Sequence, residues 1–135
     1  MVEIDVIYEG ELRCRAEHLP SGDTLHTDAP LDNEGRGELF SPTDLVATAL
    51  GSCLLTILGI MARRHGVDVR GARVRVVKEM SAGAPRRIAR LPVTLDVPAG
   101  VPDELRGPFE RALHACPVMN SLHPDIEKPL TVRWG

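Results

Sequence analysis

The sequence predicts an α+β domain in which antiparallel sheets pack around one long central helix, in the order βββ-α-ββ-α-β. Three observations predict this fold. Alternating apolar and charged residues begin the chain, a long apolar segment with helix-end signals occupies 41–66, and further strand patterns separated by a short amphipathic helix follow. With 135 residues, the chain has the size of one domain, 1–135.

The N-terminal part of the chain predicts a meander of three strands. Apolar residues at alternate positions from Val2 to Tyr8 are typical of a half-buried strand, and a glycine follows. Residues 11–19 alternate again, and a turn separates them from a shorter strand around 24–27. The turn-rich segment 30–40 lacks periodicity, so we expect a loop that leads into the central helix.

The central helix is indicated by its two ends as well as by its composition. Ser41 is a good N-cap, Pro42 is favoured as the first helical residue, and Asp44 can accept a hydrogen bond from the Ser41 amide. Cations at 63–65 followed by Gly66 are typical of a helix C-terminus. The segment between is apolar on nearly all sides. We therefore expect a helix buried at the centre of the domain rather than a membrane span.

The C-terminal part predicts a hairpin, a second helix and a closing strand. Strand patterns at 67–80 and 88–97 are joined by a short glycine- and proline-containing loop and should pair antiparallel. A helix is expected over 102–115, because Pro102 suits a first turn and the apolar spacing is helical. A short helical turn at 118–122 and a strand at 126–134 complete the chain. The helices should lie on one face of an antiparallel sheet.

Composition and charge disfavour several classes of partner. The net charge of −3 gives no electrostatic reason to bind nucleic acid or an anionic membrane, and the chain has few aromatic residues on which bases could stack. We therefore expect no nucleic-acid and no membrane partner. The acidic, alternating N-terminus does not have the pattern of a signal peptide, so a cytoplasmic location is expected.

The three cysteines lie in different settings. Cys53 is at the middle of the apolar helix, and Cys116 precedes a proline at the start of a short helix. Each could be a packing residue, but free backbone amides at a helix start lower a thiol pKa, which favours a reactive Cys116. Cys14 is expected to face the core from the second strand. The histidines, including those near Cys116, do not match a recognised zinc pattern, so no metal is expected.

Two motifs together resemble a known family. The segments SPTDLVATALGSC and CPVMNSL, which contain Cys53 and Cys116, are similar at this separation to those of the OsmC/Ohr family of thiol peroxidases, and the resemblance spans nearly the whole chain. It implies an OsmC-like fold built as an intertwined homodimer. It also implies reduction of organic hydroperoxides in oxidative stress defence, with no cofactor and an external dithiol, such as a lipoyl group, as reductant. In this resemblance Cys53 is the peroxide-attacking residue and Cys116 the resolving one.

The resemblance further implies an arginine from the N-terminal region, held by a carboxylate, that favours the thiolate of the attacking cysteine. Arg13 and Arg15 in the second predicted strand are the candidates by position, and both could equally lie on a solvated strand face. Arg36 and Glu38, in the loop before the central helix, are alternatives.

The acidic residue at the start of the central helix departs from the strongest hydroperoxide-resistance branch of the family. That branch has a glutamate directly after the motif proline, where this chain has Thr43, with Asp44 one place later. Asp44 resembles the acid of less characterised branches, and a helix cap explains it equally well. Because Asp44 and Cys53 are nine residues apart, they are separated by about 13 Å along a helix. Asp44 could therefore influence the Cys53 thiol only from another subunit or through a bridging arginine.

Small residues follow two lines along the central helix. Ala47, Gly51 and Leu55 share one face, and Thr48, Ser52 and Thr56 another, so a neighbouring helix could approach closely. Together with the family's dimeric fold, they lead us to expect that two copies of this helix meet near a subunit interface. Packing within one chain is the alternative.

Two other functions remain open from the sequence. The first is an OsmC-like protein that binds an apolar ligand and uses its cysteines only for packing, for which Thr43 in place of the glutamate is the motivation. The second is a structural zinc module.

Overall fold

The computed structural model describes residues 1–135, which form two compact units, Met1–Val46 and Ala47–Gly135. The element order is three strands, a long helix, four short strands, two helices and a last strand, which agrees with the expected order once each middle strand is divided in two. The expectation of a single domain over 1–135 stays a prediction.

The first unit contains the predicted meander. Strands β1 (Ile4–Gly10), β2 (Arg13–His18) and β3 (Asp23–Asp28) form an antiparallel sheet in the order β1-β2-β3. A 3-10 turn, η1 (Leu31–Asn33), follows in the loop before the long helix.

The expected burial of one face of β1 is wrong for the single chain. Its large apolar side chains, Ile4, Val6, Ile7 and Tyr8, are each between 52% and 64% exposed. The alternation of apolar residues therefore identified a strand correctly, but the sheet of the first unit does not bury these side chains.

The long helix α1 (Pro42–Arg64) begins and ends close to the predicted residues. Reciprocal hydrogen bonds join Ser41 and Asp44 at its start: the Ser41 amide donates to Asp44 Oδ2 over 2.9 Å, and the Asp44 amide donates to Ser41 Oγ over 3.1 Å. This is the capping box that the sequence predicted.

Burial of α1 is confined to one stripe, which corrects the expectation of a helix buried all round. The buried side chains recur at helical spacing: Ala47, Leu50, Gly51, Leu54, Leu58 and Ala62. By length and composition alone α1 could cross a membrane, but a third of its most apolar window is buried in the chain. That stripe is the interior of the second unit.

Close approach of α1 to the sheet depends on Gly51. A Cβ atom at this position would lie 3.1 Å from Val74 Cγ1 and 3.2 Å from Val76 Cγ2, both on strand β4 (Arg73–Val76). Glycine therefore lets the helix backbone lie directly against this strand. The same contact shows that α1 covers the Val74 and Val76 face of β4.

The two predicted middle strands are each interrupted. The first becomes β4 and β5 (Glu79–Met80), and the second becomes β6 (Ile88–Arg90) and β7 (Val93–Val97). Pro92, which cannot donate a ladder hydrogen bond, lies between β6 and β7. Pairing is antiparallel for β4 with β7 and for β5 with β6, which confirms the predicted hairpin.

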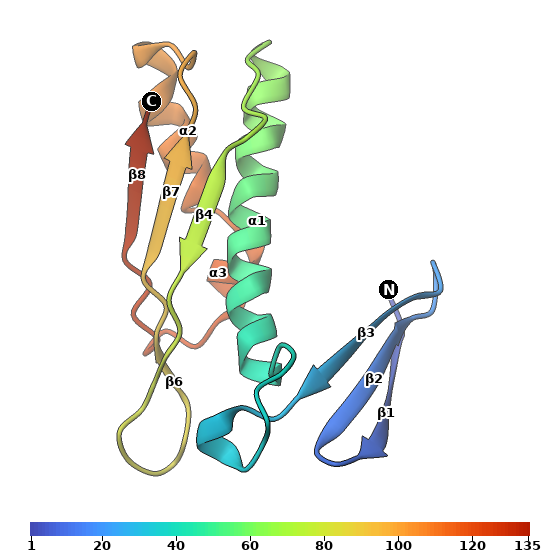
Figure 1. Cartoon of the computed structure of the whole chain (residues 1–135). Coiled ribbons are helices and arrows are strands. Elements are labelled where there is room, and N and C mark those ends of the chain that lie inside the picture. The colour runs from blue at the N-terminus through green and yellow to red at the C-terminus, as the bar shows by residue number, and fades with distance from the viewer. The chain divides into compact units, whose positions relative to one another are not determined.

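The last strand corrects the expectation of a wholly antiparallel sheet. Strand β8 (Leu130–Trp134) pairs parallel with β7, and the three-stranded sheet has the order β4-β7-β8 (Figure 1). Parallel neighbours require a crossover connection. Helices α2 (Asp103–Leu113) and α3 (Pro117–Ser121) provide it.

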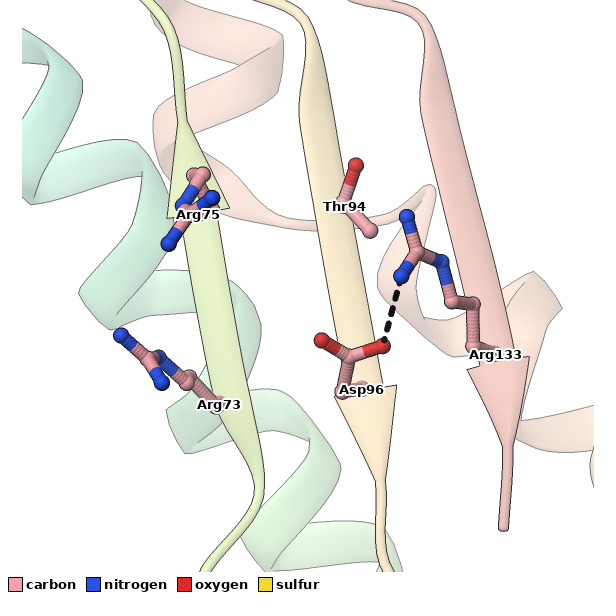
Figure 2. A pocket seen from close by; sticks show the side chains of 5 residues that line it. All are labelled: Arg73, Arg75, Thr94, Asp96 and Arg133. Carbon is pink, nitrogen blue, oxygen red and sulfur yellow. Dashed lines mark ion pairs between the residues drawn. The ribbon is translucent and has the colours of Figure 1, made fainter.

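Alternation along β7 separates the two faces of this sheet. Val93, Leu95 and Val97 are buried, whereas Thr94 and Asp96 point to the other side. Phe109 and Leu113 of α2 are also buried, and the helices lie on one side of the sheet (Figure 2). The sheet thus has a covered face and an open face.

Candidate functional site

Cys53 lies in the middle of α1 and is half-buried. Leu50 and Ile57 are three residues before and four after it, so their side chains flank the cysteine along the helix. Leu50 is fully buried, and Ile57 is half-buried. Cys53 is therefore beside the apolar stripe while part of its surface is accessible.

Cys116 lies at the N-cap of α3 and is fully buried. Pro117 occupies the first helical position, where its fixed φ and missing N–H are tolerated. The Met119 amide donates a hydrogen bond to Cys116 Sγ over 3.5 Å. The sulfur thus takes the place of the side-chain oxygen that usually caps a helix.

The fold brings these two cysteines together, although they are 63 residues apart in the chain. The Cys116 thiol is hydrogen-bonded to the Cys53 side chain. Burial raises the pKa of Cys116, and this hydrogen bond, in which the protonated thiol is the donor, raises it further.

The sequence led us to expect that backbone amides at the helix start would lower the pKa of Cys116. That expectation is wrong, because the pKa is raised. Hydrogen bonds from the backbone at Met119 and Val118 do act to lower the pKa, but removal of the thiol from water outweighs them. Burial therefore holds Cys116 as a neutral thiol beside Cys53.

Arg13 is the centre of a cluster of charges in the first unit. Its guanidinium donates a hydrogen bond to Glu38 Oε2 over 2.8 Å and lies 3.5 Å from Asp28 Oδ2. The hydrogen bond to Glu38 raises the pKa of Arg13 despite some desolvation, and Asp28 adds to the shift. Two of the predicted supporting residues, Arg13 and Glu38, are thus brought together.

The other candidate arginines have weaker partners. Arg15 lies 3.8 Å from Glu17 on the same strand, and Arg36 lies 3.8 Å from Glu11. Both pairs are at the surface, where ion pairs of this length contribute little. Arg13 is the candidate with the most defined position.

Asp28 is a residue that sequence reasoning missed. Its carboxylate is fully buried at the end of β3, where one oxygen accepts a hydrogen bond from the Glu38 amide over 3.1 Å. The other oxygen, Oδ1, has no hydrogen-bond partner. A signal existed in the sequence, because Asp28 ends a strand that pairs with the strand of Arg13, and the register places the two residues opposite each other.

Asp44 lies at the start of α1, where its carboxylate caps the helix. Cys14 is half-buried on β2 and lies opposite Tyr8 and Thr27 in the meander. The structure contains no group of three or more His, Cys, Asp or Glu side chains arranged to hold a metal ion.

Three solved structures illustrate the similarity of this fold to known proteins. A protein from Psychrobacter arcticus 273-4, provisionally described as an osmotic stress induced and detoxification response protein, is 42% identical, with a TM-score of 0.91 over 98% of this chain and 96% of that chain. An organic hydroperoxide resistance protein from Elizabethkingia anophelis is 16% identical, with a TM-score of 0.79 over 100% and 96% of the two chains.

The third is an organic hydroperoxide resistance protein OsmC from Legionella pneumophila, which is 16% identical, with a TM-score of 0.73 over 98% of this chain and 96% of that chain. At this identity, the second and third structures show a common fold. No protein with a curated function matched the sequence.

The sequence profile described as OsmC-like protein matches residues 35–128, which is more than half of the chain and includes both Cys53 and Cys116. Together with the relative from Psychrobacter arcticus, this match identifies the chain as a member of the OsmC-like protein family.

Proposed function

We propose that this protein reduces organic hydroperoxides, with Cys53 as the attacking and Cys116 as the resolving cysteine. The observation that carries the proposal is the hydrogen bond between the two thiols, contributed by α1 and by the start of α3. Two cysteines in contact, one accessible and one fully buried, have the arrangement that a sulfenic acid and its resolving thiol require.

The difference in exposure supports the assignment of roles. A hydroperoxide arriving from solvent can reach the half-buried Cys53, whereas the fully buried Cys116 can react only with its neighbour. Burial, and to a lesser extent the interaction with Cys53, also raise the pKa of Cys116, so the buried cysteine is held as a neutral thiol.

The reaction then has two steps. The Cys53 thiolate attacks the terminal, hydroxyl-bearing oxygen of the hydroperoxide, the O–O bond breaks, and Cys53 becomes a sulfenic acid. The alkoxide that leaves takes up the proton that the Cys53 thiol released on ionising, and departs as the alcohol. Cys116 next attacks the Cys53 sulfur. Its thiol proton and the sulfenic hydroxyl leave as water, and a disulfide forms.

The surroundings of Cys53 favour an apolar substrate. The half-buried Ile57 lies one turn after Cys53 on α1, so an alkyl or aryl hydroperoxide can bury apolar surface beside the reacting sulfur, whereas hydrogen peroxide cannot. We expect kcat/KM for cumene hydroperoxide to exceed that for hydrogen peroxide.

An external dithiol would complete the cycle. A compact dithiol of the lipoyl type can attack the disulfide, form a mixed disulfide and leave as its own cyclic disulfide, which returns both cysteines to thiols. None of the three cysteines is in a disulfide, and the cycle starts from reduced thiols. We propose that the protein acts in the cytoplasm, where thiols are kept reduced.

We also propose that the protein acts as a homodimer. The exposed apolar side chains of β1 form a surface that a monomer would have to keep in water. Thr48, Ser52 and Thr56 on the uncovered face of α1 leave room for a second helix. Light scattering of the purified protein at micromolar concentration should give twice the chain mass; a monomer would contradict this part of the proposal.

The activity is tested by steady-state consumption of cumene hydroperoxide with dihydrolipoamide as reductant. Cys53→Ser should abolish turnover, and Cys116→Ser should reduce it strongly while still allowing one equivalent of peroxide to react. Cys14→Ser is the matched control and should retain turnover. Retention of turnover by Cys53→Ser, or release of a bound apolar ligand from a wild-type protein without turnover, would contradict the proposal.

A further inference from the structure

The open face of the β4-β7-β8 sheet carries a hollow lined by three arginines. Its volume is about 270 Å³, and its lining consists of Arg73, Arg75, Thr94, Asp96 and Arg133. Figure 2 shows these side chains on the side of the sheet away from the helices. The hollow is therefore separate from the cysteine pair, because α1 covers the opposite face of β4.

Strand register explains why these residues meet. Arg73 pairs with Asp96 and Arg75 with Thr94 across β4 and β7, while Asp96 pairs with Arg133 across β7 and β8. Residues opposite one another in neighbouring strands point to the same face, and alternate residues along one strand do so too. A row of two arginines on β4 thus faces Arg133 on β8, with β7 between them.

The charges in this hollow are unbalanced. Asp96 Oδ1 lies 3.7 Å from Arg133 Nη1, which is the one ion pair drawn in Figure 2. Arg73 and Arg75 are exposed and make no ion pair or side-chain hydrogen bond. Three guanidinium groups therefore surround one carboxylate, although the whole chain has a net charge of −3.

We propose that this open face is a binding site for a small oxyanion that carries at least two negative charges, of the phosphate type. Guanidinium groups present a planar fork of N–H donors that matches phosphate oxygens in pairs. The ligand would lie over β7 and accept hydrogen bonds from Arg73 and Arg75 on one side and from Arg133 on the other. It would also accept a hydrogen bond from the hydroxyl of Thr94, which lies beneath it on β7.

The dimensions favour a small ligand over a polymer. Neighbouring strands are about 4.8 Å apart, so β4 and β8 are separated by about 10 Å, and the two arginines of β4 by about 7 Å along the strand. A single phosphate or pyrophosphate group fits within that frame. The only cations that line the hollow are Arg73, Arg75 and Arg133. A nucleic-acid chain would need a longer row of cations to neutralise successive phosphates.

Asp96 has a distinct role in this proposal. Its carboxylate competes with a bound anion for Arg133 and repels it. Removal of that charge should therefore strengthen binding, which is the opposite of what loss of a structural ion pair would predict.

Pyrophosphate is the probe for the experiment. The reduced wild-type protein is titrated at constant ionic strength and followed by amide resonances of β4, β7 and β8, with binding constants from calorimetry. We expect saturable shifts in these strands. Citrate and orthophosphate arms distinguish recognition of a phosphate group from recognition of charge alone: pyrophosphate should bind most tightly, and equal binding of citrate would overturn the phosphate assignment.

Variants test the assignment of residues. Arg73→Gln with Arg75→Gln should weaken pyrophosphate binding about tenfold or more, since two charge-assisted contacts are lost. Asp96→Asn should tighten it several-fold. Arg70→Gln is the matched control, because Arg70 is an exposed arginine of the same unit that pairs with Asp68, and it should leave binding unchanged.

Three results would overturn the proposal: shifts that do not saturate, equal weakening in Arg70→Gln, or weaker binding in Asp96→Asn. The test is independent of the proposed peroxidase activity. Cys53→Ser should bind pyrophosphate as the wild type does, because Cys53 is on the helix that covers the other face.

Discussion

Oxidation of Cys53 and Cys116 to a disulfide is expected to raise the free energy of unfolding by up to about 4 kcal/mol. The two cysteines are 63 residues apart, and a cross-link over a loop of this length removes that much chain entropy from the unfolded state. The native state should tolerate the bond, because the two side chains are already in hydrogen-bond contact. Any strain that the native state takes on when the two sulfurs move to bonding distance lowers the gain below this upper value.

Urea unfolding of the reduced and the peroxide-oxidised protein measures this difference. A gain of about 4 kcal/mol corresponds to a rise of about 2 M in the urea midpoint for a protein of this size. Cys14→Ser should show the same rise on oxidation, whereas Cys116→Ser should show none. If the oxidised wild type unfolds at the same or a lower urea concentration, the two sulfurs are not positioned as the reasoning requires.

Three further predictions follow from individual contacts. Folding favours the protonated form of Cys116, because its pKa is raised from the ordinary thiol value of 9.0. Its contribution to stability should therefore be present at neutral pH and be lost as the pH rises from 9.0 through the raised pKa. In urea titrations from neutral to alkaline pH, the wild type should lose stability relative to Cys116→Ser, and a constant difference would contradict this. Gly51→Ala should be less stable than Gly59→Ala by about 1–2 kcal/mol by thermal unfolding, because a Cβ at Gly51 meets two valines of β4 and one at Gly59 meets nothing within 4 Å. Arg13→Ala should destabilise the protein more than Arg15→Ala, because it leaves a fully buried carboxylate of β3 without its cation; equal unfolding midpoints would show that the buried carboxylate does not depend on Arg13.

The sequence was most informative where local chemistry decides the structure. The limits of α1 followed from its capping residues, and the Ser41 and Asp44 hydrogen bonds are those that the pattern predicts. The meander and the antiparallel hairpin followed from period-two alternation and turn residues.

The sequence was least informative where distant segments meet. The parallel pairing of β8 with β7 depends on a crossover through α2 and α3, which no local pattern specifies. For the same reason, the contact between Cys53 and Cys116 could not be derived from spacing. Burial was also overestimated, because an apolar pattern on α1 or β1 does not say which of its side chains a neighbouring element covers.

The Arg13 cluster shows what a structure adds to a motif. The resemblance implied one arginine held by one carboxylate, and position alone left Arg13 and Arg15 equivalent. The structure gives Arg13 two carboxylate partners, Glu38 and the buried Asp28, whereas Arg15 has one distant partner at the surface. Replacement of Arg13 is therefore the sharper test of whether an N-terminal arginine supports the thiol chemistry.

The central claim, that Cys53 and Cys116 form one redox centre, is tested most directly by peptide mass mapping after a single turnover. The reduced protein is mixed with one equivalent of cumene hydroperoxide, free thiols are alkylated, and the digest is analysed without reduction. We predict a peptide pair joined through Cys53 and Cys116 within one chain, with Cys14 alkylated. If both cysteines are recovered alkylated, or if the disulfide joins Cys14 to either of them, Cys53 and Cys116 do not form one redox centre.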